Sequence, residues 1–209
     1  MTKVKICGLF RPEDIKYANK LKPDYMGFMF YKKSSRYVSP EQAKELKQML
    51  NPEIVAVGVF VNEPIEFIAD LVEQKIIEMV QIHGDEDAAY IAELHERISV
   101  PIIKAVRVKD ASSFDGLENY ACDYFLFDTY KKGMYGGTGE RFNLTLGDEK
   151  RIGKKYFVAG GLDATTVGEV LEHTYAMGVD VSGGVETNGL KDENKIAAFI
   201  EAVRSKEND

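Results

Sequence analysis

Cys7 and Asp128 are residues of types that exchange protons with substrates, and each closes a short apolar run. Cys7 is followed by Gly8, and a thiol at such a position can be a nucleophile or a general base once positive charge lowers its pKa, ordinarily about 8.5. Asp128 follows three apolar residues, and partial burial there would raise the pKa of a carboxyl group and suit it to donate a proton. Position alone also allows Cys7 to be a small buried hydrophobe and Asp128 to be a helix cap or an ion-pair partner.

Arg36 and His83 follow two other apolar runs. Arg36 lies in the segment from Lys32 to Val38, and a guanidinium there could bind a substrate carboxylate through two parallel hydrogen bonds. The alternative is a solvated loop charge. His83 is the only one of the three histidines that stands at the end of an apolar run. A structural hydrogen bond is the simpler role for His83, and we keep substrate binding as the second.

Two glycine pairs follow the last two apolar runs. The first is Gly160-Gly161, and the second is Gly183-Gly184, which comes after Ser182. Glycines let main-chain N–H groups approach a phosphate, and a following helix adds positive potential at its N-terminus. A tight turn explains either pair alone. Two pairs in consecutive units favour a phosphate site.

A third glycine-rich segment, Gly133 to Gly139, follows the run that ends at Asp128. It lacks the Gly-Lys-Ser/Thr ending of a Walker loop. We expect a mobile loop that covers the substrate and excludes water, and a disordered surface loop is the alternative.

Eight short apolar segments position these residues, at a spacing of about 26 residues. They lack polar and apolar alternation, which is typical of parallel strands covered on both faces. Segments with helical periodicity separate them, and Ser39 before Pro40 marks one helix start as an N-cap. The expected strands are Val4 to Cys7, Tyr25 to Phe30, Ile54 to Val61, Met79 to Ile82, Ile102 to Val108, Tyr124 to Phe127, Tyr156 to Ala159 and Val179 to Val181.

Eight strand-helix units can close into a barrel or spread into an open doubly wound sheet. We favour a single-domain (β/α)8 TIM barrel over residues 1–209. Gly8 is not followed by the second glycine of a dinucleotide-binding fingerprint, and no linker rich in Pro, Gly or Ser divides the chain. In such barrels the carboxyl ends of the strands carry the active site, and the loops after strands seven and eight often bind phosphate. Both glycine pairs fall in those loops.

The composition narrows the range of partners and compartments. The formal net charge of -7 argues against binding to nucleic acid or to an acidic membrane surface. No stretch approaches the ~20 apolar residues of a membrane span, and the N-terminus leaves no room for a signal peptide. Cys7 and Cys122 are too few for a disulfide framework and lack zinc-like spacing, so we expect a cytoplasmic protein without a metal. The sequence does not fix the oligomeric state, and a monomer is favoured.

Seven short motifs occur in order along the chain. They are Lys5-Ile6-Cys7-Gly8, Ser34-Ser35-Arg36-Tyr37-Val38, Gly58-Val59-Phe60-Val61-Asn62, Val80-Gln81-Ile82-His83-Gly84, Gly136-Gly137-Thr138-Gly139, Ala159-Gly160-Gly161-Leu162 and Val179-Asp180-Val181-Ser182-Gly183-Gly184-Val185-Glu186. Each motif is modest alone. In this order and spacing they resemble the phosphoribosylanthranilate isomerases of tryptophan biosynthesis, and the resemblance covers nearly the whole chain.

The resemblance implies an Amadori rearrangement of N-(5'-phosphoribosyl)anthranilate to 1-(2-carboxyphenylamino)-1-deoxyribulose 5-phosphate, with no cofactor. It implies that Asp128 is the general acid, that Cys7 is the general base and that Arg36 binds the anthranilate carboxylate. The other expected substrate-binding residues are His83, Gly160, Gly161, Asp180, Ser182, Gly183 and Gly184, of which Asp180 would contact a sugar hydroxyl and the last three, with the first glycine pair, would hold the phosphate.

One position departs from the family pattern, because Gly183 stands where a second serine often follows Ser182. One hydroxyl contact with phosphate would be lost, so the glycines are better supported than Ser182 as phosphate-binding residues. Two other functions stay open. A sugar-phosphate epimerase would need metal-ligating histidines and acids on several strands, where this sequence offers His83. A non-catalytic sensor of phosphorylated sugars would have no need to keep Cys7, Asp128 and Arg36 together.

Overall fold

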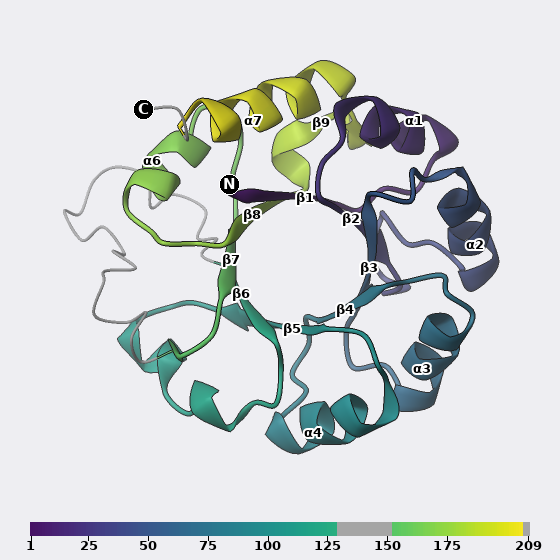
Figure 1. Ribbon diagram of the computed structural model, residues 1–209, viewed down its shortest axis with the longest axis vertical. Helices are drawn as coiled ribbons and strands as arrows, with labels where there is room; N and C mark the ends of the chain where they lie inside the picture. The colour runs from purple at the N-terminus through teal and green to yellow at the C-terminus, as the bar shows by residue number, and fades with distance from the viewer. Residues whose placement is uncertain (129–151, 207–209) are drawn as a thin grey trace.

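The computed structural model describes residues 1–128 and 152–206, and its centre is a closed barrel of eight parallel strands (Figure 1). Strands that follow one another in the sequence pair with one another, and the first pairs with the eighth. The predicted TIM barrel is confirmed, and the open sheet is excluded. The strands are β1 (Lys3–Cys7), β2 (Tyr25–Met29), β3 (Val55–Phe60), β4 (Met79–Ile82), β5 (Ile102–Arg107), β6 (Tyr124–Asp128), β7 (Tyr156–Ala159) and β8 (Gly178–Val181).

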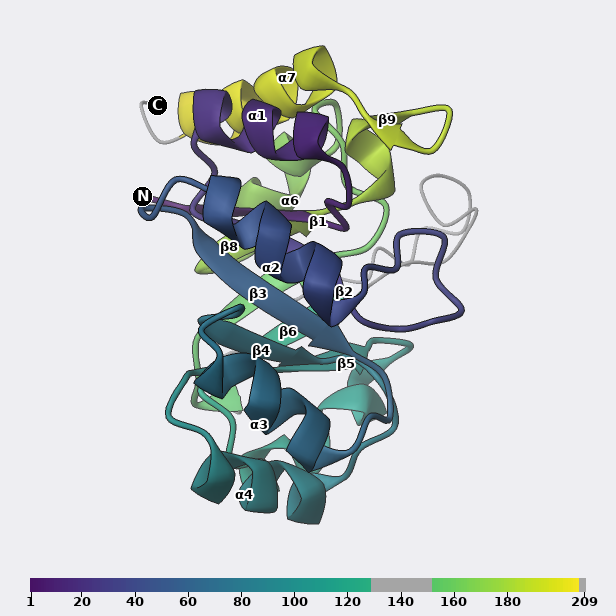
Figure 2. The ribbon, with the colours of Figure 1, turned by 90° about the vertical axis from the view of Figure 1, so that its right-hand side faces the viewer.

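Helices surround the barrel (Figures 1 and 2). They are α1 (Pro12–Leu21), α2 (Pro40–Met49), α3 (Ile65–Glu73), α4 (Ala88–Arg97), α6 (Val167–Glu172) and α7 (Glu193–Ser205). Ser39 caps α2 as predicted, because its side chain accepts a hydrogen bond of 3.2 Å from the main-chain N–H of Gln42.

Two short 3-10 helices, η1 (Ala111–Phe114) and η2 (Leu117–Asn119), connect β5 to β6 in place of the expected amphipathic helix. The side chain of Asp110 accepts a hydrogen bond from Ser112 N, and Gly116 takes the left-handed conformation at φ 77°. Asp, Ser and Gly favour turns because their side chains compete for backbone hydrogen bonds or impose no steric limit on φ. This composition ends each helix after about one turn.

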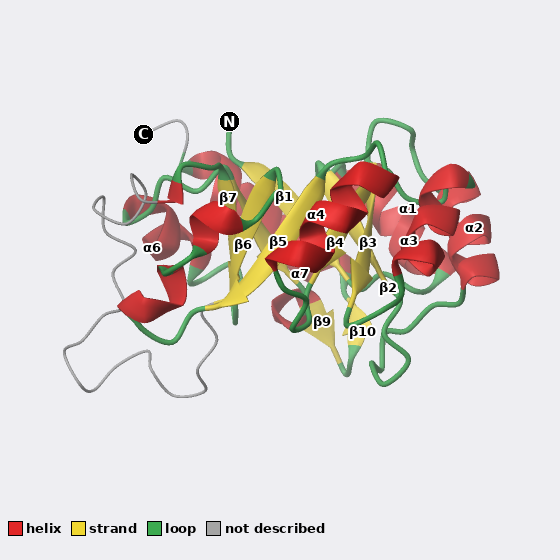
Figure 3. Cartoon of the chain, turned by 90° about the horizontal axis from the view of Figure 1, so that it is seen from below, coloured by secondary structure: helices red, strands yellow, loops and turns green. Residues whose placement is uncertain are grey.

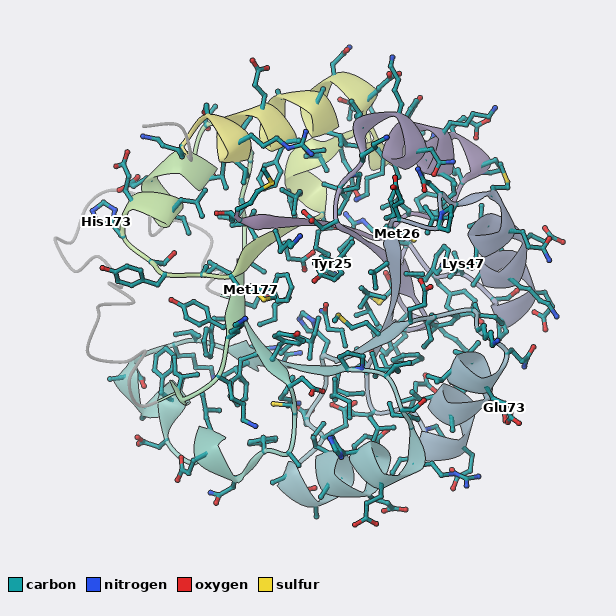
Figure 4. The ribbon with its side chains drawn as sticks, in the orientation of Figure 1. Tyr25, Met26, Lys47, Glu73, His173 and Met177 are labelled. Carbon is teal, nitrogen blue, oxygen red and sulfur yellow. The ribbon has the colours of Figure 1, made fainter. Side chains whose placement is uncertain are left out.

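Both faces of the strands are mostly apolar, which explains the missing alternation in the sequence. Figure 4 shows the alternation in space: Tyr25 lies within the ring of strands, and the next residue, Met26, lies between the ring and the helices. On the outer face, Phe30 and Phe60 stack with ring centroids 5.2 Å apart. The inner face carries a separate buried cluster formed by Val57, Met79, Ile103, Ala105, Leu126, Phe157 and Ala159.

A hairpin that the sequence analysis did not predict follows β8. A 3-10 turn, η3 (Gly183–Val185), leads into β9 (Glu186–Thr187), which pairs with β10 (Leu190–Lys191). Asn188 and Gly189 between them both have positive φ, at 54° and 78°, as a two-residue hairpin turn requires. The hairpin lies at the end of the barrel away from the N-terminus (Figure 3), on the same side as the loop between β2 and α2 (Figure 2).

Some predictions extend past the described ranges. The segment from Gly133 to Gly139 lies outside the described residues, and one domain over residues 1–209 stays a prediction. Within residues 1–128 and 152–206, no helix has the length and apolar character needed to cross a bilayer. Over the same ranges, no three or more His, Cys, Asp or Glu side chains cluster as metal ligands would. Cys122 is buried, with 4% of its surface exposed.

Candidate active site

The barrel places the predicted site residues at one end. Cys7 is the last residue of β1 and Asp128 the last of β6, while Arg36, His83 and the two glycine pairs lie in loops that leave the same ends of other strands. Parallel strands present all their carboxyl ends at one mouth, so residues that are far apart in sequence meet there. The contacts at this mouth define the candidate site.

Cys7 points into the barrel and is buried, with 7% of its surface exposed. A Cβ atom built on Gly27, its register partner on β2, would lie 2.9 Å from the Cys7 Sγ. The thiol therefore occupies the space that Gly27 leaves. Burial raises the pKa of the Cys7 thiol, although the charges of Lys5 and Lys191 act to lower it. The positive charges that the sequence analysis required are present, but the loss of solvation outweighs them.

Asp128 and His83 meet across the mouth. Oδ2 of Asp128 lies 3.5 Å from Nε2 of His83, which follows β4, and β5 stands between their strands. Asp128 ends β6 and His83 directly follows β4, so this contact lies at the carboxyl ends of the strands, at the barrel mouth. Nδ1 of His83 lies 2.8 Å from Nε2 of Gln81. With the amide nitrogen as donor, His83 Nε2 carries the ring proton and points it toward the carboxyl group of Asp128.

Arg36 lies against the hairpin after β8. Its Nε and Nη2 donate hydrogen bonds of 2.7 and 2.6 Å to the two carboxylate oxygens of Glu186. Lys191 Nζ donates to the same carboxylate at 2.5 Å. Burial opposes the charge of Glu186, but hydrogen bonds from Arg36 and Lys191 outweigh it and hold the pKa of Glu186 below its usual range. Gly8 has φ 78°, and a Cβ there would lie 2.4 Å from Arg36 Cδ, so a side chain at that position would be strained.

The turns that carry the two glycine pairs lie against each other. Gly160 and Gly161 have φ of 101° and 66°, which side chains rarely tolerate. A Cβ on Gly184 would lie 1.9 Å from the main-chain oxygen of Leu162, directly after the first pair. The two turns therefore pack backbone against backbone at adjacent strand ends. This arrangement suits a group that main-chain donors from both turns can reach.

Ser182 and Asp180 have their side chains engaged within the protein. Ser182 Oγ donates a hydrogen bond of 3.0 Å to the carbonyl oxygen of Cys7, and Lys191 Nζ lies 3.3 Å from the same Oγ. Asp180 Oδ1 accepts a hydrogen bond of 3.0 Å from Lys5 Nζ inside the barrel. These contacts tie β1 to β8 and to the hairpin. The expected contacts of Ser182 and Asp180 with substrate stay predictions.

Three charged residues at or near this end were not predicted as site residues: Lys5, Glu186 and Lys191. Lys5 is fully buried, although lysine is almost always exposed, and no local sequence pattern predicts its burial. The other two sit on the hairpin, for which the sequence holds a signal. Asn-Gly between two short segments marks a two-residue hairpin turn. That signal, at Asn188, would have placed Glu186 and Lys191 beside each other.

Known proteins resemble this chain over nearly its whole length. The sequence model of the N-(5'phosphoribosyl)anthranilate (PRA) isomerase family matches residues 4–202. The N-(5'-phosphoribosyl)anthranilate isomerase of Thermoanaerobacter pseudethanolicus is 44% identical over 204 residues, which cover 98% of this chain and 98% of that protein.

Solved structures give the same result. A crystal structure of phosphoribosyl anthranilate isomerase in complex with reduced 1-(o-carboxyphenylamino)-1-deoxyribulose 5-phosphate is 33% identical, with a TM-score of 0.85, and covers 98% of this chain and 100% of that one. Monomers of the dimeric enzyme from Thermotoga maritima are 33% identical, with a TM-score of 0.82 over 98% of this chain and 99% of that one. On this evidence, the chain belongs to the N-(5'-phosphoribosyl)anthranilate isomerase family.

Proposed function

We propose that this chain isomerises N-(5'-phosphoribosyl)anthranilate to 1-(2-carboxyphenylamino)-1-deoxyribulose 5-phosphate, with Asp128 as general acid and Cys7 as general base. The observation that carries the proposal is the placement of a thiol and a carboxyl group at the ends of β1 and β6, both facing one barrel mouth. Arg36 and the paired glycine turns border the same mouth. A relative that is 33% identical has been crystallised in complex with the reduced form of this product, which supports the choice of substrate.

Asp128 begins the reaction by giving its proton to the ring oxygen of the ribose. The bond between that oxygen and C1 breaks, and the lone pair of the anilino nitrogen forms a double bond to C1. The nitrogen becomes positively charged, which acidifies the proton on C2. His83, 3.5 Å from the carboxyl group, is placed to orient Asp128 during this transfer.

Cys7, as the thiolate, then removes the C2 proton. The C–H electrons form the C1–C2 double bond, and the electrons of the C1–N double bond return to nitrogen. The enolamine becomes the ketone as C1 gains a proton and the C2 hydroxyl group loses one. No electrons leave the substrate, so the residues need only accept, donate and position.

Arg36 binds the anthranilate carboxylate in this proposal. Glu186 takes two of its donors, Nε–H and one N–H of Nη2, and a guanidinium has five, so the edge formed by Nη1 and Nη2 could bind a second carboxylate. The main-chain donors of Gly160, Gly161, Gly183 and Gly184 hold the phosphate at the other end. The distance between these two anchors would fix the sugar between acid and base.

The experiment that tests the function is a fluorescence assay of substrate loss, with product identified by mass, for the parent chain and for Cys7→Ala and Asp128→Asn. We expect turnover by the parent and its loss in both variants. Binding of substrate without turnover by the parent would instead support the sensor of phosphorylated sugars. The dimeric relative makes the oligomeric state a separate question, and the monomer stays a prediction, as does the cytoplasmic location.

A further inference from the structure

Three polar side chains are buried inside a barrel that is otherwise filled by apolar ones. Lys5 is 0% exposed, Gln81 1% and Asp180 8%. Removing an ammonium group from water costs several kcal/mol unless close partners compensate. A closed barrel could place an apolar side chain at each of these positions, so the presence of Lys5 needs an explanation.

The buried charge of Lys5 is paired with that of Asp180. Lys5 on β1 and Asp180 on β8 are direct register partners, and Nζ lies 3.0 Å from Oδ1. The ion pair compensates the buried charge of each group. Compensation alone does not account for the pair, because an apolar pair of similar volume is commonly as stable or more so.

Cys7 supplies the rest of the explanation. Lys5 and Cys7 are two residues apart on β1, so their side chains leave the strand on the same side. Both groups border Gly27: a Cβ there would lie 2.9 Å from the Cys7 Sγ and 3.3 Å from the Lys5 Nζ. The thiol and the ammonium group thus share the small volume that the missing side chain of Gly27 leaves.

The charged groups around the thiol differ in how they are already engaged. Lys191 on β10 is bound to Glu186 at 2.5 Å and donates to the main chain of Ser182 at 3.1 Å. Arg36, from the loop after β2, is bound to both oxygens of Glu186. Lys5 approaches from the barrel interior, where Asp180 is its carboxylate partner.

Lys5 and Cys7 each shift the pKa of the other. Burial lowers the pKa of Lys5, but Asp180 and Cys7 outweigh it and raise that pKa, so the ammonium group keeps its proton. Burial raises the pKa of Cys7, Lys5 acts most strongly to lower it, and Asp180 acts to raise it.

We propose that Lys5 is the positioning residue of the base: its ammonium group, held in the barrel by Asp180, stabilises the Cys7 thiolate in the space left by Gly27. The catalytic consequence of this inference rests on the proposed function. Its effect on the thiol does not, so the two can be tested apart.

The thiol pKa can be measured directly by NMR in chains labelled with ¹³C at the cysteine Cβ, with Cys122→Ser to assign the two signals. Lys5→Met should raise the pKa of Cys7 by about 1 or more, as the loss of a close opposite charge does. Asp180→Asn should lower it, because a carboxylate that opposes the thiolate is removed. The two variants each remove one partner of the same ion pair, and they should shift the Cys7 pKa in opposite directions. Opposite shifts distinguish an electrostatic effect on Cys7 from general loosening of the barrel.

Lys104→Met is the matched control. Lys104 is also a buried lysine, 5% exposed, and its Nζ donates to Gly84 O at 2.9 Å on the outer side of β5. Its removal takes away a buried ammonium group far from Cys7, and the Cys7 pKa should stay at the parent value. An equal change in Lys104→Met and Lys5→Met would overturn the proposal.

Should Lys5→Met fail to fold because Asp180 is left unpaired, the double variant Lys5→Met/Asp180→Asn carries the test without a buried lone charge. Its Cys7 pKa should lie above that of the parent, since Lys5 acts on the thiol more strongly than Asp180 does. A Cys7 pKa unchanged from the parent, in either variant, contradicts the proposal.

Turnover gives the second readout. In Lys5→Met the rise of kcat with pH should move to higher pH, with partial recovery of kcat at alkaline pH and little change in KM. If the parent turns over substrate and the Cys7 pKa is the same in Lys5→Met as in the parent, this inference fails and the function stands. If the pKa responds to Lys5 and the parent shows no turnover, the function fails and the effect of Lys5 on the thiol stands.

Discussion

The two ends of the barrel are built by the same eight strands and differ in what they place inside. At the amino end, Tyr25 and Tyr124 pack edge-on against Phe157, with ring centroids 5.5 and 6.2 Å away, and Met177 also packs against this inner cluster (Figure 4). At the carboxyl end stand a thiol, a carboxyl group, an imidazole and main-chain turns of glycine.

The difference between the ends shows how one small barrel separates stability from chemistry. Along β7 the packed ring of Phe157 lies only two positions before Ala159, which ends the strand at the mouth and precedes the first glycine pair. Lys5 and Asp180 lie between the two ends. We expect substitutions at the amino end to change the free energy of unfolding and those at the carboxyl end to change turnover, and each prediction below can break that division.

Cys7→Ala and Asp128→Asn should have the largest effect on turnover. General acid and base groups usually contribute about 10² to 10⁴ in rate, so kcat should fall by that factor in each variant. Because both residues lie at the mouth, the unfolding midpoint in urea should stay near that of the parent. A kcat within a few-fold of the parent would remove the residue from the chemistry.

Phe157→Ala should have the largest effect on stability. Phe157 is fully buried and contacts two tyrosine rings, and truncation of such a residue costs about 3–5 kcal/mol. Urea denaturation measures this loss. The kcat/KM of the fraction that stays folded should match the parent, and a drop in kcat/KM as large as that of Cys7→Ala would show that the two ends are not independent.

Gly184→Ala should act on the phosphate end of the site. Its Cβ would lie 1.9 Å from a main-chain oxygen, so the two glycine turns must move apart, at a cost of about 1–3 kcal/mol. We expect KM to rise about tenfold or more while kcat changes less.

Gly168→Ala is the control for this change. Its Cβ would meet only the flexible end of Lys206, at 3.2 Å, on a helix that follows the same barrel end. An equal rise of KM in both variants would argue that the glycine turns hold nothing specific.

Glu186→Gln should loosen Arg36 and raise KM for substrates that carry the carboxylate. Hydrogen bonds to charged groups contribute about 1.5–3 kcal/mol when buried, and the partly exposed pair here should contribute less, so we expect a rise of about tenfold or below. Loss of kcat with unchanged KM would contradict the assignment of Arg36 to ground-state binding.

The smallest expected effect is on the pH dependence of stability, and it comes from the same pair, Arg36 and Glu186. Because the pKa of Glu186 is held below its usual range, the carboxylate contributes stability that is fully present above the unfolded pKa of about 4.3. That contribution is lost as pH falls through the lower, folded value. In urea titrations the difference between parent and Glu186→Gln should be constant above about pH 5 and shrink below; a difference that grows on acidification would refute it.

The barrel could be predicted because its signals are local. Strand-length apolar runs and the Ser39 cap each depend on a few neighbouring residues, and their order then selects the closed sheet. The partnership of Lys5 with Asp180 depends on the register between the first and eighth strands, which closure sets. No window of sequence holds that information.

The site was predicted in the same uneven way. Cys7, Asp128 and Arg36 could be named because each stands beyond an apolar run, and the structure places them at one mouth. Their immediate partners could not be named. Glu186 reaches Arg36 from a hairpin, and the position of that hairpin depends on how the folded chain packs at the mouth. Burial likewise reversed the expected direction of the Cys7 pKa, because desolvation depends on the whole barrel.

A crystal structure of this chain with reduced 1-(o-carboxyphenylamino)-1-deoxyribulose 5-phosphate tests the central claim most directly. We predict that Cys7 Sγ will lie about 3–3.5 Å from C2 of the sugar and that the Asp128 carboxyl group will contact the former ring oxygen from the other side. The phosphate should lie between the two glycine turns. A ligand that leaves either Cys7 or Asp128 out of contact with the sugar would contradict the account.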